Sequence, residues 1–501
     1  MRTVSGPTDS VVIIGAGLGG LSAALHLAGA GRHVTVLETA AVPGGRAGVI
    51  RSHGYQFDTG PTVLTMPALV AAPLAAVGEK LEDWLTLHRL DPAYRANFAD
   101  GSSINVHTGA DAMREEISAT CGSAEAAGYV RFVEFLRELY RIEMPNFIDR
   151  NLDTAHRLAG MPLARLAWMG GFRRLDSKVA QFFQDERLRR LFSFQAMYAG
   201  MAPAQALAIY AVITYMDCVE GVYFPQGGMH AVPQALAGAA AEHGVQFRYG
   251  VTASRVEVAG GRATAVITSG GNRIPADVVV VNADLPTAYR DLLPPGYTPG
   301  RVRRLRYSPS AVVLHVGSSA RMPAPAHHVI DFGTRWGETF HQIIDRGELM
   351  SDPSFLLTNP THTDSSLAPP GHHTYFALFP TPNLDHRAPL DWARIAPAYR
   401  DEILATLERR GFSGFEAGIE CEFLRTPADW KAQGLAGGAP FAAAHTFGQT
   451  GPFRAPTLDR RISNLVFCGS NTQPGVGVPM VLISGRLAAQ RITGAPDTID
   501  E

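Results

Sequence analysis

The 501-residue sequence has few cysteines and almost no net charge. Its 44 basic and 46 acidic residues nearly cancel, which argues against nucleic acid as the main partner. No two cysteines form a C-x-x-C pair, which argues against a disulfide framework and a zinc site and favours a reducing compartment. The four cysteines are Cys121, Cys218, Cys421 and Cys468.

The sequence also lacks the pattern of a secretion signal and that of a membrane-spanning segment. A signal peptide needs a basic start, an apolar block and a small-residue cleavage site, whereas this chain begins MRTVSGPTDS. A span needs about 20 consecutive apolar residues, and the apolar stretch 11–38 is interrupted by His26, Arg32 and His33. We therefore expect a cytoplasmic protein that is peripherally associated with a membrane surface.

The stretch VVIIGAGLGGLSAALHLAGAGRHVTVLE, residues 11–38, has the pattern of a strand, a helix and a second strand. We expect a buried strand at 11–14, a helix at 21–28 and a strand at 33–37. The same pattern is also compatible with an ordinary glycine-rich turn between a strand and a helix.

The glycines decide in favour of a dinucleotide site, because Gly15, Gly17 and Gly20 form G-x-G-x-x-G. The first allows a tight turn, the second lets a pyrophosphate approach the backbone, and the third lets the helix pack on the strand. The helix N-terminus attracts phosphates. Glu38, at the end of the second strand, is placed to accept hydrogen bonds from a ribose.

A second glycine turn, Gly44-Gly45, is followed by Arg46. A chain that binds NAD would normally continue into another βαβ unit here. Two glycines permit close approach of the backbone to a ligand, and the arginine can pair with a phosphate. A plain turn is the alternative interpretation of the two glycines.

The C-terminal part repeats the order of strand, glycine-rich loop and helix, with NLVFCG at 464–469, SNTQPGVGVP, and a predicted helix at 480–492. A helix N-terminus there would stabilise the negative charge of a reduced flavin. Between the two ends we predict a helix at 230–242 and short strands around Val245 and at 251–258, 263–267 and 278–281. Val251 begins a strand that could meet an adenine, with core packing as the alternative.

Four motifs carry a resemblance to a known family: residues 12–46, GPT at 60–62, FPQGGM at 224–229 and FCGSNTQPGVGVP at 467–479. Together they resemble bacterial phytoene desaturases, in the carotenoid desaturase group of FAD-dependent, amine-oxidase-like flavoproteins. Residues 178–200 and 363–385 are similar to the same group, so the resemblance runs essentially end to end. The first motif is shared by many flavoproteins, and the others narrow it to the carotenoid enzymes.

The resemblance implies an α/β fold with an α+β substrate part. A Rossmann-type FAD-binding domain is assembled from discontinuous segments, and an inserted substrate-binding domain contains a mixed sheet and helices. The implied FAD segments are 1–110, 225–300 and 456–501. A helical, membrane-associated substrate part is implied at 111–224, and the substrate-binding domain at 301–455.

The resemblance also implies which residues hold FAD. Many members carry a glycine where this chain has Met480, which is bulky and flexible. No metal ligand is implied. The implied residues are Gly15, Ala16, Gly17, Gly19, Gly20, Gly45 and Arg46 at the pyrophosphate, Glu38 at the ribose, Val251 at the adenine, Gly60, Pro61 and Thr62 near the flavin ring, and Gly469, Val478, Pro479 and Met480 at the flavin end.

The implied reaction is stepwise desaturation of 15-cis-phytoene to lycopene, by hydride transfer to flavin and loss of a proton. Oxygen or a quinone is the expected electron acceptor. The sequence does not identify the base: Glu143 is one candidate, although glutamates are more often exposed than catalytic. The pairs His327-His328 and His372-His373 are interpreted as surface-loop residues, because adjacent histidines point in different directions and no acidic or cysteine partner stands at ligand spacing.

A C40 hydrocarbon is almost insoluble in water, so its source must be a membrane. Residues 161–183 mix apolar and basic side chains, as a surface-seated amphipathic element does. A helix packed in the substrate domain is the alternative, and Gly170-Gly171 argues against one long helix. The other functions that we consider are desaturation of a later carotenoid, carotenoid isomerisation, amine oxidation and non-enzymatic carriage of a prenyl lipid.

Overall fold

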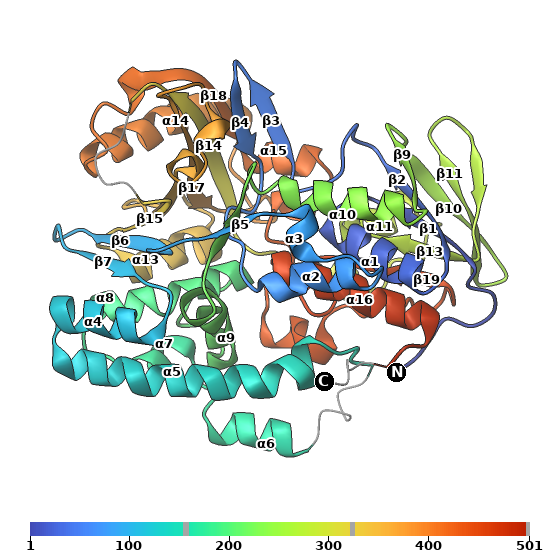
Figure 1. Ribbon diagram of the computed structural model, residues 1–501, viewed down its shortest axis with the longest axis horizontal. Coiled ribbons are helices and arrows are strands. Elements are labelled where there is room, and N and C mark those ends of the chain that lie inside the picture. The colour runs from blue at the N-terminus through green and yellow to red at the C-terminus, as the bar shows by residue number, and fades with distance from the viewer. Residues whose placement is uncertain (154–159, 321–325, 497–501) are drawn as a thin grey trace.

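The computed structural model describes residues 1–153, 160–320 and 326–496. One half of the molecule is built on a five-stranded sheet of order β19-β13-β1-β2-β9, in which all neighbours run parallel (Figure 1). Its strands come from three distant parts of the chain: β1 (Ser10–Ile14), β2 (His33–Glu38), β9 (Gln246–Tyr249), β13 (Val278–Val281) and β19 (Leu465–Phe467).

Both faces of this sheet are covered, which explains why its strands are almost continuously apolar. Val11 and Ile13 pack in the same core as helices α1 (Leu18–Gly29), α10 (Ala231–Glu242) and α16 (Val478–Thr493). Val12 and Ile14 face the opposite core. That core is formed with α11 (Leu285–Asp291) and with the small antiparallel sheet β10 (Ala253–Ala259), β11 (Arg262–Thr268) and β12 (Arg273–Pro275).

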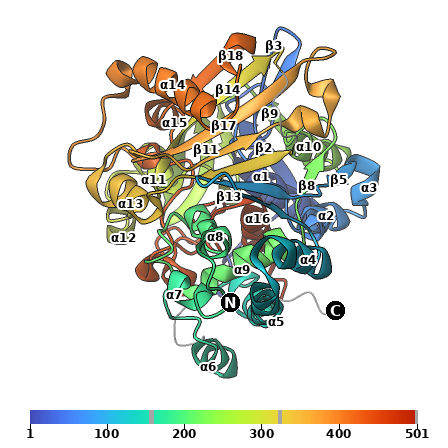
Figure 2. The ribbon, with the colours of Figure 1, turned by 90° about the vertical axis from the view of Figure 1, so that its left-hand side faces the viewer.

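The other half contains a mixed seven-stranded sheet of order β18-β14-β17-β16-β15-β6-β7, which Figure 2 shows from its side of the molecule. Alternation along β14 gives the sheet two different faces: Val312 and Leu314 pack on helix α14 (Trp392–Arg409), whereas Ala311 and Val313 face a cavity. The strands are β6 (Tyr94–Phe98), β7 (Ser103–Val106), β14 (Ser310–Ser318), β15 (His328–Phe332), β16 (Phe355–Thr358), β17 (His373–Thr381) and β18 (Ile419–Arg425).

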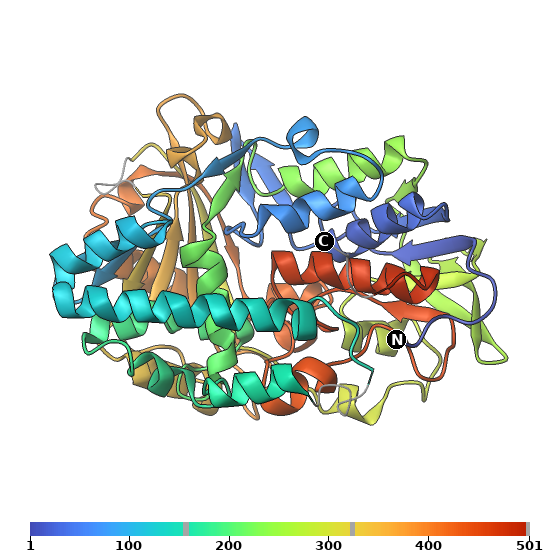
Figure 3. The ribbon, with the colours of Figure 1, turned by 60° about the horizontal axis from the view of Figure 1, so that its bottom comes forward.

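A layer of helices lies along the lower side of the molecule, which Figure 3 brings forward, and several of its members line the cavity. Its longest member, α5 (Ser123–Glu143), continues as the π-helix η1 (Met144–Ile148). The others are α4 (Ala110–Cys121), α6 (Met161–Trp168), α7 (Leu175–Val179), α8 (Glu186–Leu191), η3 (Phe194–Ala199), η4 (Ala208–Tyr210), α9 (Ala211–Thr214) and the π-helix η5 (Tyr215–Val219).

Short elements complete the fold. They are the ribbons β3 (Val49–Ser52) with β4 (Tyr55–Asp58) and β5 (Leu87–Arg89) with β8 (Tyr223–Pro225), and the helices α2 (Pro67–Ala75), α3 (Leu81–Trp84), α12 (Gly300–Arg303), α13 (Trp336–Phe340) and α15 (Pro427–Ala432). Within the described residues, no helix is both long and apolar enough to span a bilayer.

The predicted elements are present with shifted ends. Helix α1 begins at Leu18, three residues earlier than expected, so that its first turn contains Gly19 and the motif's Gly20. Helix α16 begins at Val478, because Pro479 fits the first turn, where its missing N–H costs nothing. The break at Gly170-Gly171 also occurs, between α6 and α7.

One strand pairing crosses the predicted division of the chain into FAD-binding and substrate-binding segments. Strands β6 and β7 lie within 1–110, the range predicted for the first FAD segment, yet β6 pairs with β15 and completes the seven-stranded sheet. The predicted domain boundaries themselves remain a prediction.

Candidate functional site

The first turn after β1 brings helix α1 into unusually close contact with the sheet. Gly15 has a φ of 102°, a conformation that favours glycine. A Cβ atom on Gly20 would lie 2.2 Å from the carbonyl oxygen of Gly15. The motif's glycines are therefore required by backbone packing, and the free N–H groups of the first turn of α1 are brought to the end of β1.

Glu38 holds the end of this loop from the neighbouring strand. Its carboxylate accepts hydrogen bonds from the backbone N–H of Ala16 at 2.7 Å and of Ala40 at 2.8 Å. The N–H of Val251 donates to the Glu38 carbonyl at 2.9 Å. A carboxylate offers about four acceptor positions, so Glu38 retains capacity for a ribose hydroxyl while it holds the loop.

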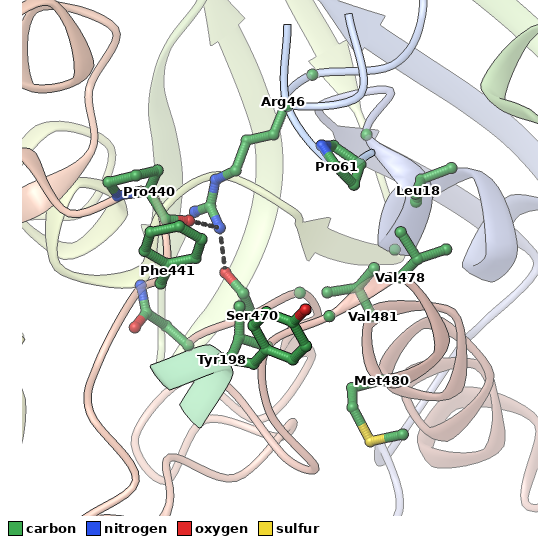
Figure 4. Close-up of a pocket in the computed structure, with 18 of the residues that line it drawn as sticks. Leu18, Arg46, Pro61, Tyr198, Pro440, Phe441, Ser470, Val478, Met480 and Val481 are labelled. Atoms are coloured by element: carbon green, nitrogen blue, oxygen red, sulfur yellow. Dashed lines mark hydrogen bonds between the residues drawn. The ribbon is translucent and has the colours of Figure 1, made fainter. Parts of the chain in front are cut away.

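Arg46 reaches across the cavity from the second glycine turn (Figure 4). Its Nη1 donates to Ser470 Oγ at 2.7 Å and to the Pro440 carbonyl at 3.1 Å, and its Nη2 lies 3.7 Å from Asp284 Oδ2. The side chain remains 32% exposed, so the guanidinium can reach a phosphate in the cavity. The Arg46 backbone packs closely on Gly60, since a Cβ atom on Gly60 would lie 2.1 Å from the Arg46 carbonyl oxygen.

A second helix N-terminus enters the cavity from the C-terminal segment. Gly469, with a φ of 107°, lies two residues after the end of β19, and Val478, Pro479 and Met480 lie in the first turn of α16. Met480 reaches the cavity wall with Val478 and Val481 (Figure 4). Because α1 and α16 pack side by side and both begin here, two positive helix ends face one space.

This space is a single cavity of about 1660 Å³, whereas pockets for one small molecule usually measure about 300–1,000 Å³. Ala16 and Gly20 do not reach its wall, because they are buried behind the loop. The predicted residues that line it are Gly15, Gly17, Gly19, Glu38, Gly45, Arg46, Gly60, Pro61, Thr62, Val251, Gly469, Val478, Pro479 and Met480.

The polar half of the cavity fits FAD. The Glu38 carboxylate at one end suits a ribose. The bare backbone of the glycine turns, Arg46 and the N-terminus of α1 suit a pyrophosphate, and the N-terminus of α16 suits a flavin. The roles of individual residues toward each part of FAD remain predictions.

The other half of the cavity is apolar, with two acidic exceptions. Glu143, at the end of α5, is only 6% exposed, and its Oε1 has no hydrogen-bond partner among the described residues. Burial raises the pKa of its carboxyl well above the ordinary 4.5. Asp217, on η5, is 3% exposed. The apolar lining includes Phe147, Leu166, Phe172, Leu207, Ile213, Met216, Leu356, Phe376, Phe447 and Phe453.

Three polar residues of the site were not predicted from the sequence. With its amide oxygen turned to the loop, Asn282 accepts from the N–H of Gly20 at 3.1 Å and of Gly17 at 3.3 Å. Asp284 and Ser470 are the partners of Arg46. The signal that could have found them is position, since each follows a parallel strand at its carboxyl end, where ligands bind.

The interpretation of His327-His328 as surface-loop residues is wrong. Both are buried, at 2% and 0% exposure, and His328 begins β15. Each Nδ1 is paired with a threonine hydroxyl, and burial lowers the pKa of His328 to about 3. His372, by contrast, lies just before β17 and is partly exposed, whereas His373 is also partly exposed but is the first residue of β17 and not part of a loop. Over the described ranges, no three His, Cys, Asp or Glu side chains gather as a metal ion would require.

Known proteins match along the whole chain. Residues 18–493 match the family model described as flavin containing amine oxidoreductase. The phytoene dehydrogenase of Streptomyces griseus is 56% identical over 495 residues, which cover 99% of this chain and 97% of the relative. The zeta-carotene-forming phytoene desaturase of Myxococcus xanthus is 40% identical over 490 residues, which cover 96% and 93%.

The solved structure of putrescine oxidase bound to putrescine superposes with a TM-score of 0.61 at 16% identity, covering 97% of this chain and 99% of that one. This likeness confirms the predicted fold class. The family match and the two relatives confirm the resemblance on which the cofactor was predicted. FAD is therefore the cofactor of this chain, which belongs to the carotenoid desaturases among the flavin-containing amine oxidoreductases.

Proposed function

We propose that the protein desaturates phytoene, converting 15-cis-phytoene to lycopene in several FAD-dependent steps. The observation that carries the proposal is the cavity, whose polar FAD half continues into an apolar half lined by aromatic and aliphatic side chains. A long hydrocarbon needs such a wall, whereas a small amine does not. The names of the two relatives support phytoene as the substrate.

The residues of the cavity supply binding, orientation and exclusion of water. When bound, FAD accepts the hydride that no side chain can accept. The face of the seven-stranded sheet and the helical layer hold the polyene between Phe376 on one side and residues such as Ile213 and Met216 on the other. By holding the reacting CH–CH pair against the flavin, the cavity walls give the substrate the orientation that hydride transfer requires.

The number of steps is the finer part of the proposal, because the Myxococcus relative is named for zeta-carotene and the Streptomyces relative for no product. Each new double bond extends the conjugation and eases the next step, so a substrate that stays bound or rebinds proceeds to lycopene. Oxygen or a quinone is the proposed final electron acceptor.

A membrane surface is the proposed source of the substrate. Helix α6 and the turn after it expose Met161 (82%), Trp168 (78%) and Phe172 (41%). Phe172 also lines the cavity, so this apolar surface lies at a cavity opening. The Arg165 guanidinium lies 4.9 Å from the centroid of the Trp168 ring, and a basic group beside exposed aromatic rings suits the headgroup layer of anionic lipid.

Vesicle flotation tests the membrane step. The double variant Met161→Asp with Trp168→Asp should lose binding to vesicles that contain anionic lipid and should desaturate phytoene from vesicles slowly, with FAD content unchanged. Val130→Asp is the matched control, because Val130 is an exposed apolar residue (42%) on α5. Equal flotation of all three proteins would contradict the proposed membrane surface.

Expression in cells that accumulate phytoene tests the reaction. Chromatography and absorption spectra of the extracted pigments should show lycopene, and Gly17→Trp, which fills the glycine turn, should leave phytoene unconverted. If zeta-carotene accumulated instead, it would be the product, and the proposed conversion to lycopene would be wrong. Unchanged phytoene, from a protein purified with FAD bound, would overturn the proposed substrate.

A further inference from the structure

Two carboxyl groups interrupt the apolar half of the cavity, and they differ in their surroundings. Glu143 has no hydrogen-bond partner at Oε1 among the residues described. Asp217 accepts a hydrogen bond at Oδ2 from the Tyr94 hydroxyl at 3.4 Å. An isolated buried carboxyl is held in its neutral form, whereas a partnered one is eased toward ionisation.

Asp217 is also connected to the FAD end of the cavity. The Tyr94 hydroxyl interacts in turn with the Tyr198 side chain. Tyr198, on η3, lines the cavity and is drawn with Arg46 and Ser470 in Figure 4. The Tyr198 side chain therefore interacts electrostatically with Asp217 and also lies in the part of the wall where FAD is expected.

The backbone at Asp217 is unusual as well. Residues Tyr215–Val219 form a π-helix, η5, in direct continuation of α9. The π-helical turn is rare and is found frequently at functional sites. Here both Asp217 and Met216 line the cavity. Among the residues that the structure describes, no basic side chain forms a salt bridge with Asp217 that would offset the cost of burying its carboxylate.

We propose that the Asp217 carboxylate accepts the proton that phytoene loses in each desaturation, an inference that rests on the proposed function. One C–H bond of the reacting pair breaks and its hydrogen leaves with both electrons for FAD. The C–H bond on the adjacent carbon breaks, its proton goes to Asp217 Oδ, and its electron pair becomes the new double bond. When a quinone reoxidises the cofactor, it takes up the hydride equivalent and one proton to give a quinol, so that charge and atoms balance.

The ionisation of Asp217 suits this role at neutral pH. Burial raises its pKa to about 7, against a smaller lowering by the Tyr94 hydrogen bond. The titratable groups that face it are Tyr94 from β6, Tyr198 from η3 and Cys218 on its own helix, and the pKa of each is raised well above its ordinary value by burial. These three groups remain neutral near pH 7, so within this cluster the change of charge belongs to Asp217. A base with a pKa near the working pH is the most effective.

The experiment uses the FAD-loaded full chain and compares Asp217→Asn with Asp217→Glu. The asparagine has the shape of the protonated side chain, so the variant should fold and keep FAD. Its rate of flavin reduction by phytoene should fall about 10²–10⁴-fold, the usual contribution of a general base. The glutamate should recover part of that rate. In the wild type the rate should rise with pH around pH 7 and level off above it, and this limb should be missing in Asp217→Asn.

Glu143→Gln is the matched variant in the same cavity. It should keep the rise near pH 7, whatever its absolute rate. The rise near pH 7 could instead be lost in Glu143→Gln and kept in Asp217→Asn. That result would assign the proton to Glu143 and overturn the proposal. An Asp217→Asn variant with wild-type rate would overturn it equally.

Infrared difference spectra provide a readout that needs no turnover. A carboxylic-acid C=O band that titrates near pH 7 should be present in the wild-type holoprotein and missing in Asp217→Asn. Its presence in both proteins would remove Asp217 as the titrating group. Failure of the proposed function is distinguishable, because it would leave wild-type flavin oxidised in the presence of phytoene.

Discussion

Gly20→Ala is the sharpest test of how the dinucleotide turn is built. The added Cβ would lie 2.2 Å from the Gly15 carbonyl oxygen, whereas ordinary contacts begin at 3.4 Å. The neighbour is backbone, so α1 must move away from β1 by about 1 Å to relieve the contact. Overpacking of a dense core costs about 1–3 kcal/mol, and we expect the free energy of unfolding of the FAD-free protein to fall by this amount.

The same displacement should weaken cofactor binding. Moving α1 carries its N-terminal N–H groups away from the pyrophosphate position, and a loss of about 1.4 kcal/mol corresponds to a tenfold weaker affinity. We therefore expect the dissociation constant of FAD, measured by fluorescence titration of the apoprotein, to rise about tenfold or more.

Gly337→Ala is the control for this substitution. Gly337 lies in the short helix α13, and nothing lies within 4 Å of the position that its Cβ would occupy. Alanine is the better helix former, so this variant should be as stable as the wild type or slightly more stable. If Gly20→Ala matched Gly337→Ala in both denaturant midpoint and FAD affinity, the close packing of α1 on the Gly15 turn would not be what requires glycine.

Three further predictions concern other parts of the molecule. Glu38→Ala should lower the FAD content of purified protein, because it removes the ribose acceptor and the bonds to Ala16 and Ala40; a flavin-to-protein absorbance ratio equal to the wild type would refute the ribose assignment. Asn464→Ala should lower the free energy of unfolding by roughly 3 kcal/mol or more in urea titrations, because a buried side chain that joins β11 to Asp277, just before β13, loses three hydrogen bonds and leaves their backbone partners unsatisfied; a loss below about 1 kcal/mol would contradict this. Asp217 binds its proton more tightly in the folded than in the unfolded chain, since burial raises its pKa from 3.8 to about 7. The contribution of Asp217 to wild-type stability should therefore fall as the pH rises through this window, by up to roughly 4 kcal/mol, and the stability of Asp217→Asn relative to the wild type should rise over the same window; parallel pH profiles of the two proteins would refute the raised pKa.

Local patterns in the sequence were sufficient for the dinucleotide turn. Strand β1, helix α1 and strand β2 follow one another directly, so apolar periodicity and the spacing of Gly15, Gly17 and Gly20 predict the unit without knowledge of the rest. The same holds for Gly469 and the start of α16, where a strand, a glycine-rich loop and a proline in the first helical turn occur in order. In these places the chemistry depends on neighbours in the chain.

Residues whose role depends on distant segments could not be predicted in this way. Asn282 meets the glycine turn only because β13 pairs with β1, and Arg46 meets Ser470 only because β19 joins the same sheet. The burial of His328 likewise follows from the pairing of β15 with β6 and β16.

The sequence by itself determined the two glycine turns, because these depend on local backbone geometry, and the resemblance of its motifs to the carotenoid desaturases implied the family and the cofactor. Only the tertiary structure decided which charged groups lie in the substrate half of the cavity. In the sequence Glu143 is only one candidate for the base and Asp217 carries no signal, whereas in the structure the packing of α5, η3, η5 and β6 around them removes their water. Loss of solvent, rather than residue type, is what shifts the pKa of a carboxyl group toward the pH at which it can exchange a proton.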